Sequence, residues 1–138
     1  MSSRVKNVAA TPVAIVDGAS GAVSAVGAPI SSATLTVAGT AVDLTDVSGG
    51  IPVAAKWARV EAQCAWAPKV YEDPALTVEV SDRIRYSYTA TAPTATSGFF
   101  LADGDPLLIS EDLLEAFQFI LDGDAAAANA TLFITFHA

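Results

Sequence analysis

The side chains that most often carry out catalysis are scarce in this chain of 138 residues. His137 is the one histidine, and its place beside the C-terminus favours a surface histidine over a general base. Without another histidine, neither a Ser–His–Asp nor a Cys–His set can be assembled. Cys64, the one cysteine, falls on the apolar side of an alternating segment, which indicates a small core residue rather than a reactive thiolate. We therefore predict no catalytic residues and a protein that is not an enzyme.

Two Asp-Gly-Asp turns offer a different chemistry, the binding of a calcium ion. Asp103 and Asp105 form the first turn, and Asp122 and Asp124 form the second. Carboxylate oxygens on loops are the ligands that calcium prefers. The alternative is that aspartate and glycine are good turn formers on a solvated rim. Because the spacing of a complete calcium-binding loop, with its late bidentate glutamate, is absent, we favour the second interpretation and predict neither a metal nor a cofactor.

Arg83 and Arg85 stand two residues apart in an alternating segment, so both guanidinium groups lie on one face of a candidate strand. Such a pair can bind a partner carboxylate, although arginines more often form the solvent-exposed side of a strand. No phosphate-binding loop is indicated, because the glycines near Gly18, Gly21 and Gly49 are not followed by the Lys and the Ser or Thr that such a loop uses.

The composition opposes some partners and favours others. With 7 basic and 15 acidic residues, the formal net charge of -8 opposes binding to nucleic acid or to an anionic membrane. No apolar run approaches the roughly 20 residues of a membrane-spanning helix, and Asp17-Gly18 interrupts the first apolar run before it resembles a signal peptide. Hydrophobic residues nevertheless make up 52% of the chain, and the mean hydropathy is +0.46. We therefore expect apolar surface that another chain covers, and an oligomer or assembly subunit rather than a monomer.

Alternation of apolar and polar residues predicts an all-β fold. It is clearest where Ile84, Tyr86 and Tyr88 point to one side, which we expect to be the buried face. Other candidate strands are Val13 to Val16, Ala22 to Val26, Ala33 to Leu44 with a turn at Gly39, Lys56 to Trp66, Leu76 to Val80, Ala116 to Leu121 and Thr131 to Phe136, with a helical turn at Ser110 to Glu115. Short strands separated by Gly, Pro or Asp turns indicate an antiparallel β-sandwich or jelly roll, with a closed barrel as the alternative.

The chain divides most clearly at Gly49-Gly50. Every aromatic residue lies at or beyond Trp57, so the first part lacks the large side chains that usually anchor a core. We predict an Ala-, Val- and Gly-rich N-terminal arm and edge strands over residues 1–50, as either an extended arm or thin edge hairpins, and the β-sandwich core over residues 51–138.

The second half of the chain resembles small virion proteins of tailed bacteriophages. The motifs that carry the resemblance are Tyr86 to Thr89, Pro93 to Leu101, Gly104-Asp105, Phe117 to Ile120 and Ala130 to Phe136. In such proteins a strand, a Pro-Thr-Ala-Thr-type loop, a Gly-Asp turn and a final Ala-Thr-Leu strand recur. The resemblance covers about residues 83 to 137 and implies a β-sandwich that serves as a capsid cement or decoration protein.

The resemblance implies a non-enzymatic structural protein that stabilises the phage head by binding across junctions of the major capsid protein. The implied location is the outer surface of the head, after synthesis in the host cytoplasm, and the implied self-association is a homotrimer. Neither nucleic acid nor membrane is an expected partner. Under this interpretation the N-terminal segment and an aromatic loop contact the partner, through Val13, Ile15, Val23, Val26, Ile30, Phe99, Phe100 and Leu101.

Two other hypotheses remain open. A tail- or fibre-associated adhesion module would recognise a host glycan or protein through Trp57, Tyr71 and the Pro93 loop. A metal-assisted enzyme would depend on the acidic loops. Calcium-dependent melting would favour these two hypotheses, whereas indifference to a chelator would favour the structural one.

Overall fold

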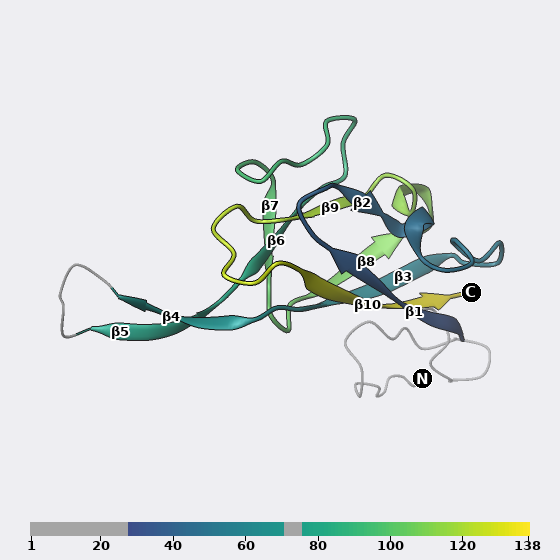
Figure 1. Cartoon of the computed structure of the whole chain (residues 1–138). Helices are drawn as coiled ribbons and strands as arrows, with labels where there is room; N and C mark the ends of the chain where they lie inside the picture. Colours follow the sequence, from purple (N-terminus) through teal and green to yellow (C-terminus); the bar gives the residue numbers. More distant parts are fainter. Residues whose placement is uncertain (1–27, 71–75) are drawn as a thin grey trace, which may run out of the picture.

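The computed structural model describes residues 28–70 and 76–138, and this part of the chain is all-β (Figure 1). Its strands are β1 (Pro29–Val37), β2 (Val42–Asp43), β3 (Trp57–Gln63), β4 (Trp66–Val70), β5 (Thr77–Ser81), β6 (Arg83–Ser87), β7 (Phe99–Ala102), β8 (Pro106–Ser110), β9 (Gln118–Leu121) and β10 (Ala130–His137). Two short 3-10 helices, η2 (Leu44–Asp46) and η3 (Glu111–Leu113), lie between strands. The helical turn predicted at Ser110 to Glu115 is confirmed by η3.

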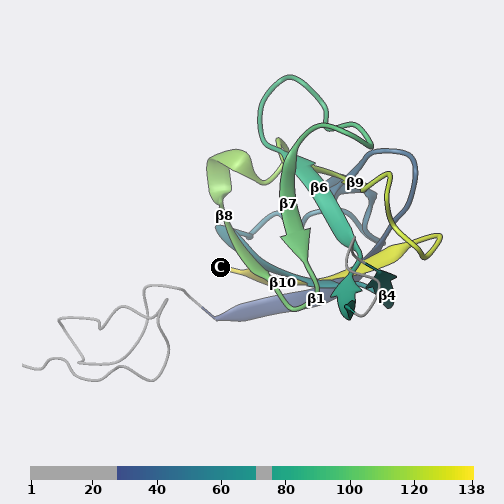
Figure 2. The same ribbon diagram turned by 90° about the vertical axis from the view of Figure 1, so that its left-hand side faces the viewer.

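Two four-stranded sheets pack face to face, with the orders β1-β10-β3-β8 and β2-β9-β6-β7 (Figure 2). Every strand pair in them is antiparallel. A third, two-stranded sheet consists of β4 and β5 alone. The predicted antiparallel β-sandwich is therefore confirmed, and the two separate strand orders distinguish it from a closed barrel.

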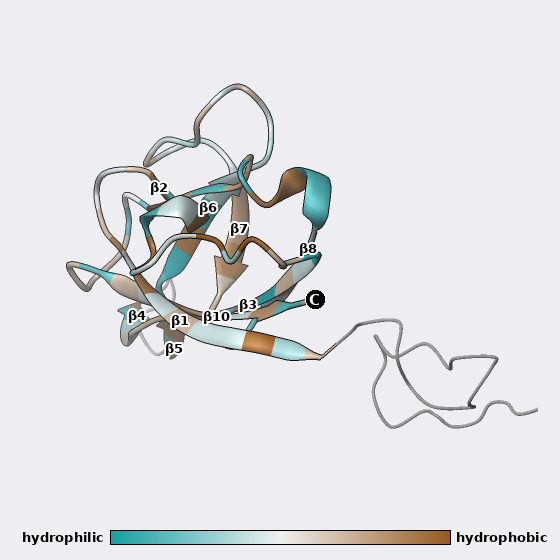
Figure 3. Cartoon of the chain, turned by 90° about the vertical axis from the view of Figure 1, so that its right-hand side faces the viewer, coloured by the Kyte–Doolittle hydropathy of each residue, from teal (hydrophilic) through white to brown (hydrophobic). Residues whose placement is uncertain are grey.

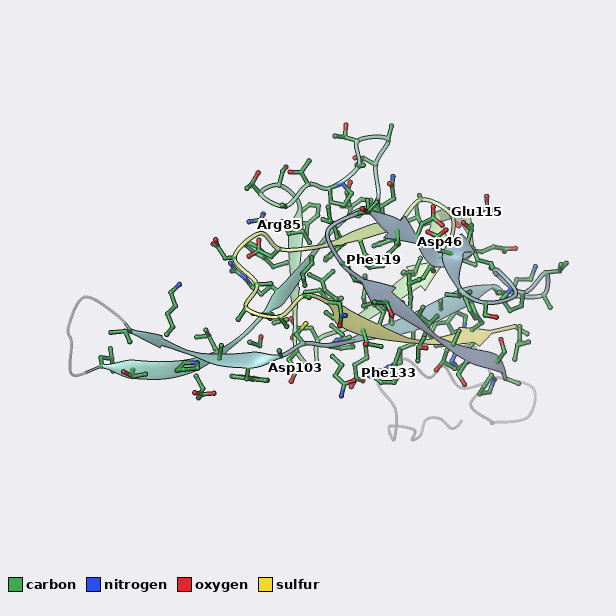
Figure 4. The ribbon with its side chains drawn as sticks, viewed as in Figure 1. Asp46, Arg85, Asp103, Glu115, Phe119 and Phe133 are labelled. Carbon is green, nitrogen blue, oxygen red and sulfur yellow. The ribbon has the colours of Figure 1, made fainter. Side chains whose placement is uncertain are left out.

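The core lies between the two large sheets and follows the alternation of the sequence. On β10, Leu132, Ile134 and Phe136 are buried, whereas Phe133 between them is 47% exposed. Phe119 comes from the opposite sheet and is fully buried. Figure 4 shows Phe119 between the layers and Phe133 on the outer side of its sheet. Large side chains thus reach the core from both sheets.

The predicted domain boundary at Gly49-Gly50 is wrong, because strands from both sides of it share one core. β1 pairs with β10 along its length, for example Ala33 with Ile134, and β2 pairs with β9. Leu35, Val37, Leu44 and Val47 are all buried in the common core. Small residues suffice here because the phenylalanines of the second half fill the space between the sheets. The sandwich therefore includes residues from Pro29 onward, and the candidate strands Val13 to Val16 and Ala22 to Val26 lie outside the described residues.

The segment Ala33 to Leu44 is not a hairpin around Gly39, contrary to prediction. β1 belongs to one large sheet and β2 to the other, so the chain crosses between the layers here. The N–H of Leu121 donates to the carbonyl of Ala38 at 2.9 Å and holds the crossing segment against β9.

The predicted long strand Lys56 to Trp66 is interrupted. Ala58, Val60, Ala62 and Cys64 alternate along it and are buried, but Trp66 is 56% exposed and begins a separate strand. β4 leaves the sandwich at this point and pairs with β5, which confirms the strand predicted at Leu76 to Val80 with a shift of one residue. The face of Ile84, Tyr86 and Tyr88 was predicted to be buried, but it is buried only as far as Tyr86, because Tyr88 is exposed.

Candidate partner-binding surfaces

The β4–β5 hairpin projects from the sandwich (Figure 1). Its two strands pair from Trp66 with Ser81 to Val70 with Thr77, and among residues 28–70 and 76–138 no further strand joins them. Apolar side chains are exposed along it, with Val70 at 66% and Leu76 at 48%. An isolated two-stranded hairpin is only marginally stable in water. A surface that covers these side chains would therefore stabilise the hairpin.

The base of the hairpin is fixed by the carboxylate of Asp103. It accepts a hydrogen bond from the backbone N–H of Cys64 at 2.8 Å and another from the indole Nε1–H of Trp66 at 2.9 Å. The Trp66 and Cys64 hydrogen bonds hold the pKa of the Asp103 carboxyl below its usual value. Figure 4 places Asp103 where β4 and β5 leave the sandwich. The interruption after β3 therefore has a cause, because this carboxylate takes the N–H that a continuing strand would use.

Asp82 fixes the other strand of the hairpin. Its N–H donates to the carbonyl of Ala65 at 2.7 Å. Its buried carboxylate accepts the N–H groups of Ala126 and Ala127, both at 2.8 Å. The hairpin thus leaves the sandwich in a defined direction, attached both to β3 and to the loop before β10.

A groove of about 880 Å³ lies between the hairpin base and the 122–126 turn. Lys69, Glu79, Arg83 and Asp124 give it charges of both signs. The buried carboxylates of Asp82 and Asp122, which also line it, already bind protein donors. No group of three or more His, Cys, Asp and Glu side chains suited to a metal ion occurs in the described part of the chain. Asp103 and Asp122, one from each Asp-Gly-Asp turn, instead bind donors of the protein itself.

Arg83 and Arg85 bind a carboxylate of this chain, that of Asp122, rather than one of a partner. Arg85 Nε donates to Oδ1 of Asp122, and Arg83 lies 3.6 Å from Oδ2 of the same residue. Both guanidinium groups also lie over the ring of Phe100, at 3.8 and 4.4 Å from its centroid. The two arginines therefore link β6, β7 and the turn after β9. They are part of the fold, and the hypothesis of a partner carboxylate receives no support.

Five aromatic rings gather at one end of the sandwich and form what we call the aromatic patch. Its members are Tyr86, Tyr88, Phe99, Phe117 and Phe119. Phe119 is buried, and the exposed end consists of Tyr88 and Phe99, whose rings are nearly parallel, with 8° between their planes and 5.8 Å between their centroids. Burial, and then the neighbouring Tyr88, raise the pKa of the Tyr86 hydroxyl. The exposed edges and faces of the Tyr88 and Phe99 rings offer apolar surface to a ligand or partner.

Some of the residues predicted to contact a partner lie on the surface. Phe99 and Phe100 are about half exposed, and Ile30 at the start of β1 is exposed. Leu101 is only 3% exposed and packs in the core, so its predicted contact role is corrected. It alternates with Phe100 on β7 and therefore faces the opposite way. The remaining predicted contacts, Val13, Ile15, Val23 and Val26, lie outside the described residues.

Cys64 and His137 show no arrangement for catalysis. Cys64 is buried, and burial, with contributions from Asp103, Asp82 and Asp105, raises the pKa of its thiol to about 11. His137 stacks on Trp57, with ring centroids 4.0 Å apart.

Within the described residues, no helix has the length and apolar character needed to span a membrane.

The hairpin is the surface that was missed at the level of sequence. Pro68 and the alternation from Leu76 to Val80 indicated short strands there, but nothing local indicated that these strands leave the sandwich.

Comparisons with protein-family models, with curated proteins and with solved structures find no match to this chain.

Proposed function

We propose that the chain is a non-enzymatic structural protein that binds a larger assembly, and that this assembly is the head of a tailed bacteriophage. In this role it is a cement or decoration protein, bound across junctions of the major capsid protein on the outer surface of the head. The observation that carries the proposal is the projecting β4–β5 hairpin, with exposed apolar side chains on a fixed base.

The energetics of the hairpin support a docking role. Trp66, Val70, Leu76 and Val78 are all between 39% and 66% exposed. Complete burial of a Val or Leu side chain stabilises a complex by about 1.5–3 kcal/mol, before the cost of association is subtracted. Asp103 and Asp82 hold the hairpin base in place, so the direction in which the hairpin projects is fixed before a partner covers it. A ligand that binds only the assembled shell stabilises that shell by mass action.

The identity of the assembly rests on the resemblance of residues 83 to 137 to small virion proteins. The net charge of -8 agrees with an outer surface better than with one that faces DNA. The exposed rings of Phe99 and Phe100, with Ile30, provide further apolar surface for the major capsid protein. In this proposal Val13, Ile15, Val23 and Val26 add contacts from the N-terminal segment.

Co-sedimentation with purified heads of the phage that encodes this chain tests the proposal. The full chain should pellet at a stoichiometry comparable with that of the major capsid protein. Val70→Asp, on the hairpin, should weaken binding at least about tenfold, because a charge would be buried at the contact. Leu108→Asp is the matched control, since Leu108 is 47% exposed on β8 and lies off the hairpin. A full chain that stays in the supernatant, or a Val70→Asp variant that pellets equally well, would overturn the proposal.

The aromatic patch favours adhesion as a second candidate function. The exposed rings of Tyr88 and Phe99 are aromatic surface of the kind on which sugar rings stack. Of the residues first considered for this role, Trp57 is stacked on His137, the loop around Pro93 is exposed although Pro93 itself is buried, and Tyr71 lies outside the described residues. Binding of host glycans that is lost in Tyr88→Ala, without co-sedimentation with heads, would favour adhesion over the capsid role.

A further inference from the structure

The outer edge of β1 is a long strand edge with no partner among residues 28–70 and 76–138. β1 has nine residues and is the first strand of the order β1-β10-β3-β8, so only β10 pairs with it. An unpaired edge exposes backbone N–H and C=O groups, which makes it a template for a strand of another chain.

Hydrogen bonds at the end of β10 define the direction of its backbone groups. The N–H of Lys56, on the β3 side, donates to the carbonyl of His137 at 2.7 Å. The N–H of Ala138 donates to the carbonyl of Ala28, on the β1 side, at 3.1 Å. Because these groups alternate in direction along a strand, the backbone groups of Phe136 and of every second residue before it face β1.

The same alternation defines which groups of β1 face the open edge. Ile134 is one of the residues whose backbone faces β1, and it pairs with Ala33. The backbone groups of Ala33 therefore point to β10, and those of its neighbours point away. Ser32, Thr34 and Thr36 thus present their N–H and C=O groups to the open edge, while their side chains lie on the outer face of the sheet, opposite the buried Leu35 and Val37.

Other strand edges in the described residues carry features that oppose pairing. β2 has two residues and β7 has four. β8 begins at Pro106, β4 contains Pro68 and Lys69, and β5 contains Glu79. Proline and charged side chains are the usual means by which proteins block an edge. β1 contains no charged residue, and its one proline is Pro29 at its first position.

The charge distribution indicates which partner fits this edge. A chain with a net charge of -8 repels its own copies over most of its surface. β1 is neutral, and residues 18–42 contain no Asp, Glu, Lys or Arg. Figure 3 shows β1 mostly in the pale colours of intermediate hydropathy. Two copies can therefore meet along β1 with little repulsion, and the outward hydroxyls of Ser32, Thr34 and Thr36 form favourable cross-strand pairs.

We propose that β1 pairs antiparallel with β1 of a second copy of the chain across a twofold axis. The two β1-β10-β3-β8 sheets then form one continuous sheet through the dimer. A twofold axis follows because the same edge is open in both copies, and an isologous contact satisfies both edges at once. This dimer goes beyond the proposed function and differs from the homotrimer that the resemblance implies.

The molar mass of the full chain in solution, measured by light scattering and sedimentation over a range of concentrations, tests the proposal. The full chain should approach twice the 14.1 kDa chain mass. Thr34→Pro removes one N–H that faces the open edge and leaves the β1–β10 hydrogen bonds intact, so it should weaken the dimer at least about tenfold. Thr34→Lys, which places two like charges across the twofold axis, should do the same without restricting the backbone.

Gln63→Lys is the matched control. Gln63 is exposed at the end of β3, which is an interior strand, so the substitution adds the same charge away from the open edge. It should leave the dimer unchanged. Thermal melting of each variant confirms that it is folded. A full chain that is monomeric at every concentration, as it would be if another segment of the same chain covered the edge, would overturn the proposal. So would a trimer, or a dimer unaffected by both Thr34 substitutions.

Discussion

Replacing Asp122 by asparagine should destabilise the fold by about 2–3 kcal/mol. This carboxylate follows β9 and bonds to Arg85 on β6 and to Arg83 beside it, so it links the turn to the sheet. The substitution keeps the shape of the side chain but removes its negative charge. A guanidinium that is largely removed from water is then left without a counter-charge.

The magnitude follows from the burial of the two pairs. The side chains of Asp122 and Arg85 are only 4% and 15% exposed, so this pair is largely desolvated. Removal of one partner of a buried pair costs about 3–5 kcal/mol, and the remaining amide oxygen, which still accepts one hydrogen bond, reduces the cost. Arg83 is 41% exposed, and its longer contact at 3.6 Å adds little. For a domain of this size the loss lowers the melting temperature by about 10 °C.

Urea unfolding followed by circular dichroism measures the effect, with the slope of the transition checked to confirm that both proteins unfold to the same extent. Asp124→Asn is the matched control, since Asp124 lies in the same turn and is exposed. It should change the unfolding free energy by less than about 0.5 kcal/mol. Equal effects of the two substitutions, or a loss below about 0.5 kcal/mol for Asp122→Asn, would refute the role of the buried pair.

Three further predictions concern pH and packing. The pKa of the Cys64 thiol rises from 9.0 to about 11 on folding, so stability should fall as the pH rises through this window, and alkylation of the folded protein should stay slow at pH 8. The pKa of Asp103 is lowered by its hydrogen bonds, so its contribution to the stability of the fold should be lost as the pH falls below about 3.8. Trp66 fluorescence should change over the same pH range, and Asp103→Asn should abolish that change. Leu101→Ala should cost about 2–4 kcal/mol in denaturant unfolding, and Phe99→Ala, on the exposed end of the same strand, clearly less. Equal losses would contradict the difference in burial between the two side chains.

The parts of the fold that depend on local pattern could be predicted from the sequence. Leu132, Ile134 and Phe136 alternate with Phe133 and Thr135, and in the structure this alternation separates the buried face of β10 from its outer face. The same reasoning identified β6 and the antiparallel sandwich. Such elements are determined by neighbours two residues apart, which a sequence displays directly.

The parts that were missed depend on residues far apart in the chain. β3 ends where it does because Asp103 bonds to Cys64 and Trp66, 37 or more positions earlier. Arg85 was assigned to a free surface because its partner, Asp122, also stands 37 positions away. Sequence periodicity reports on residues only a few positions apart, so it does not reveal contacts between residues that are 37 or more positions apart.

The placement of residues 29–50 outside the core failed for a related reason, although β1 and β2 are edge strands as predicted. Their side chains are small, and a core made from them alone would be thin. In the structure Phe119 and Phe136 supply the missing volume from the other half of the chain. Of the predicted contact surface, Phe99 and Phe100 are exposed as expected, whereas Leu101 is buried. Leu101 faces the opposite way from Phe100, and it shares the face of Phe99 but packs in the core.

Hydrogen–deuterium exchange of the β4–β5 hairpin, measured on the free protein and on protein bound to purified phage heads, tests the central claim most directly. In the free protein the amides of β4 and β5 should exchange much faster than those of β10, because each of these two strands has only one neighbouring strand among the described residues. On the heads the hairpin should become strongly protected, while β10 stays unchanged. Protein that binds the heads with no added protection in the hairpin would contradict the account.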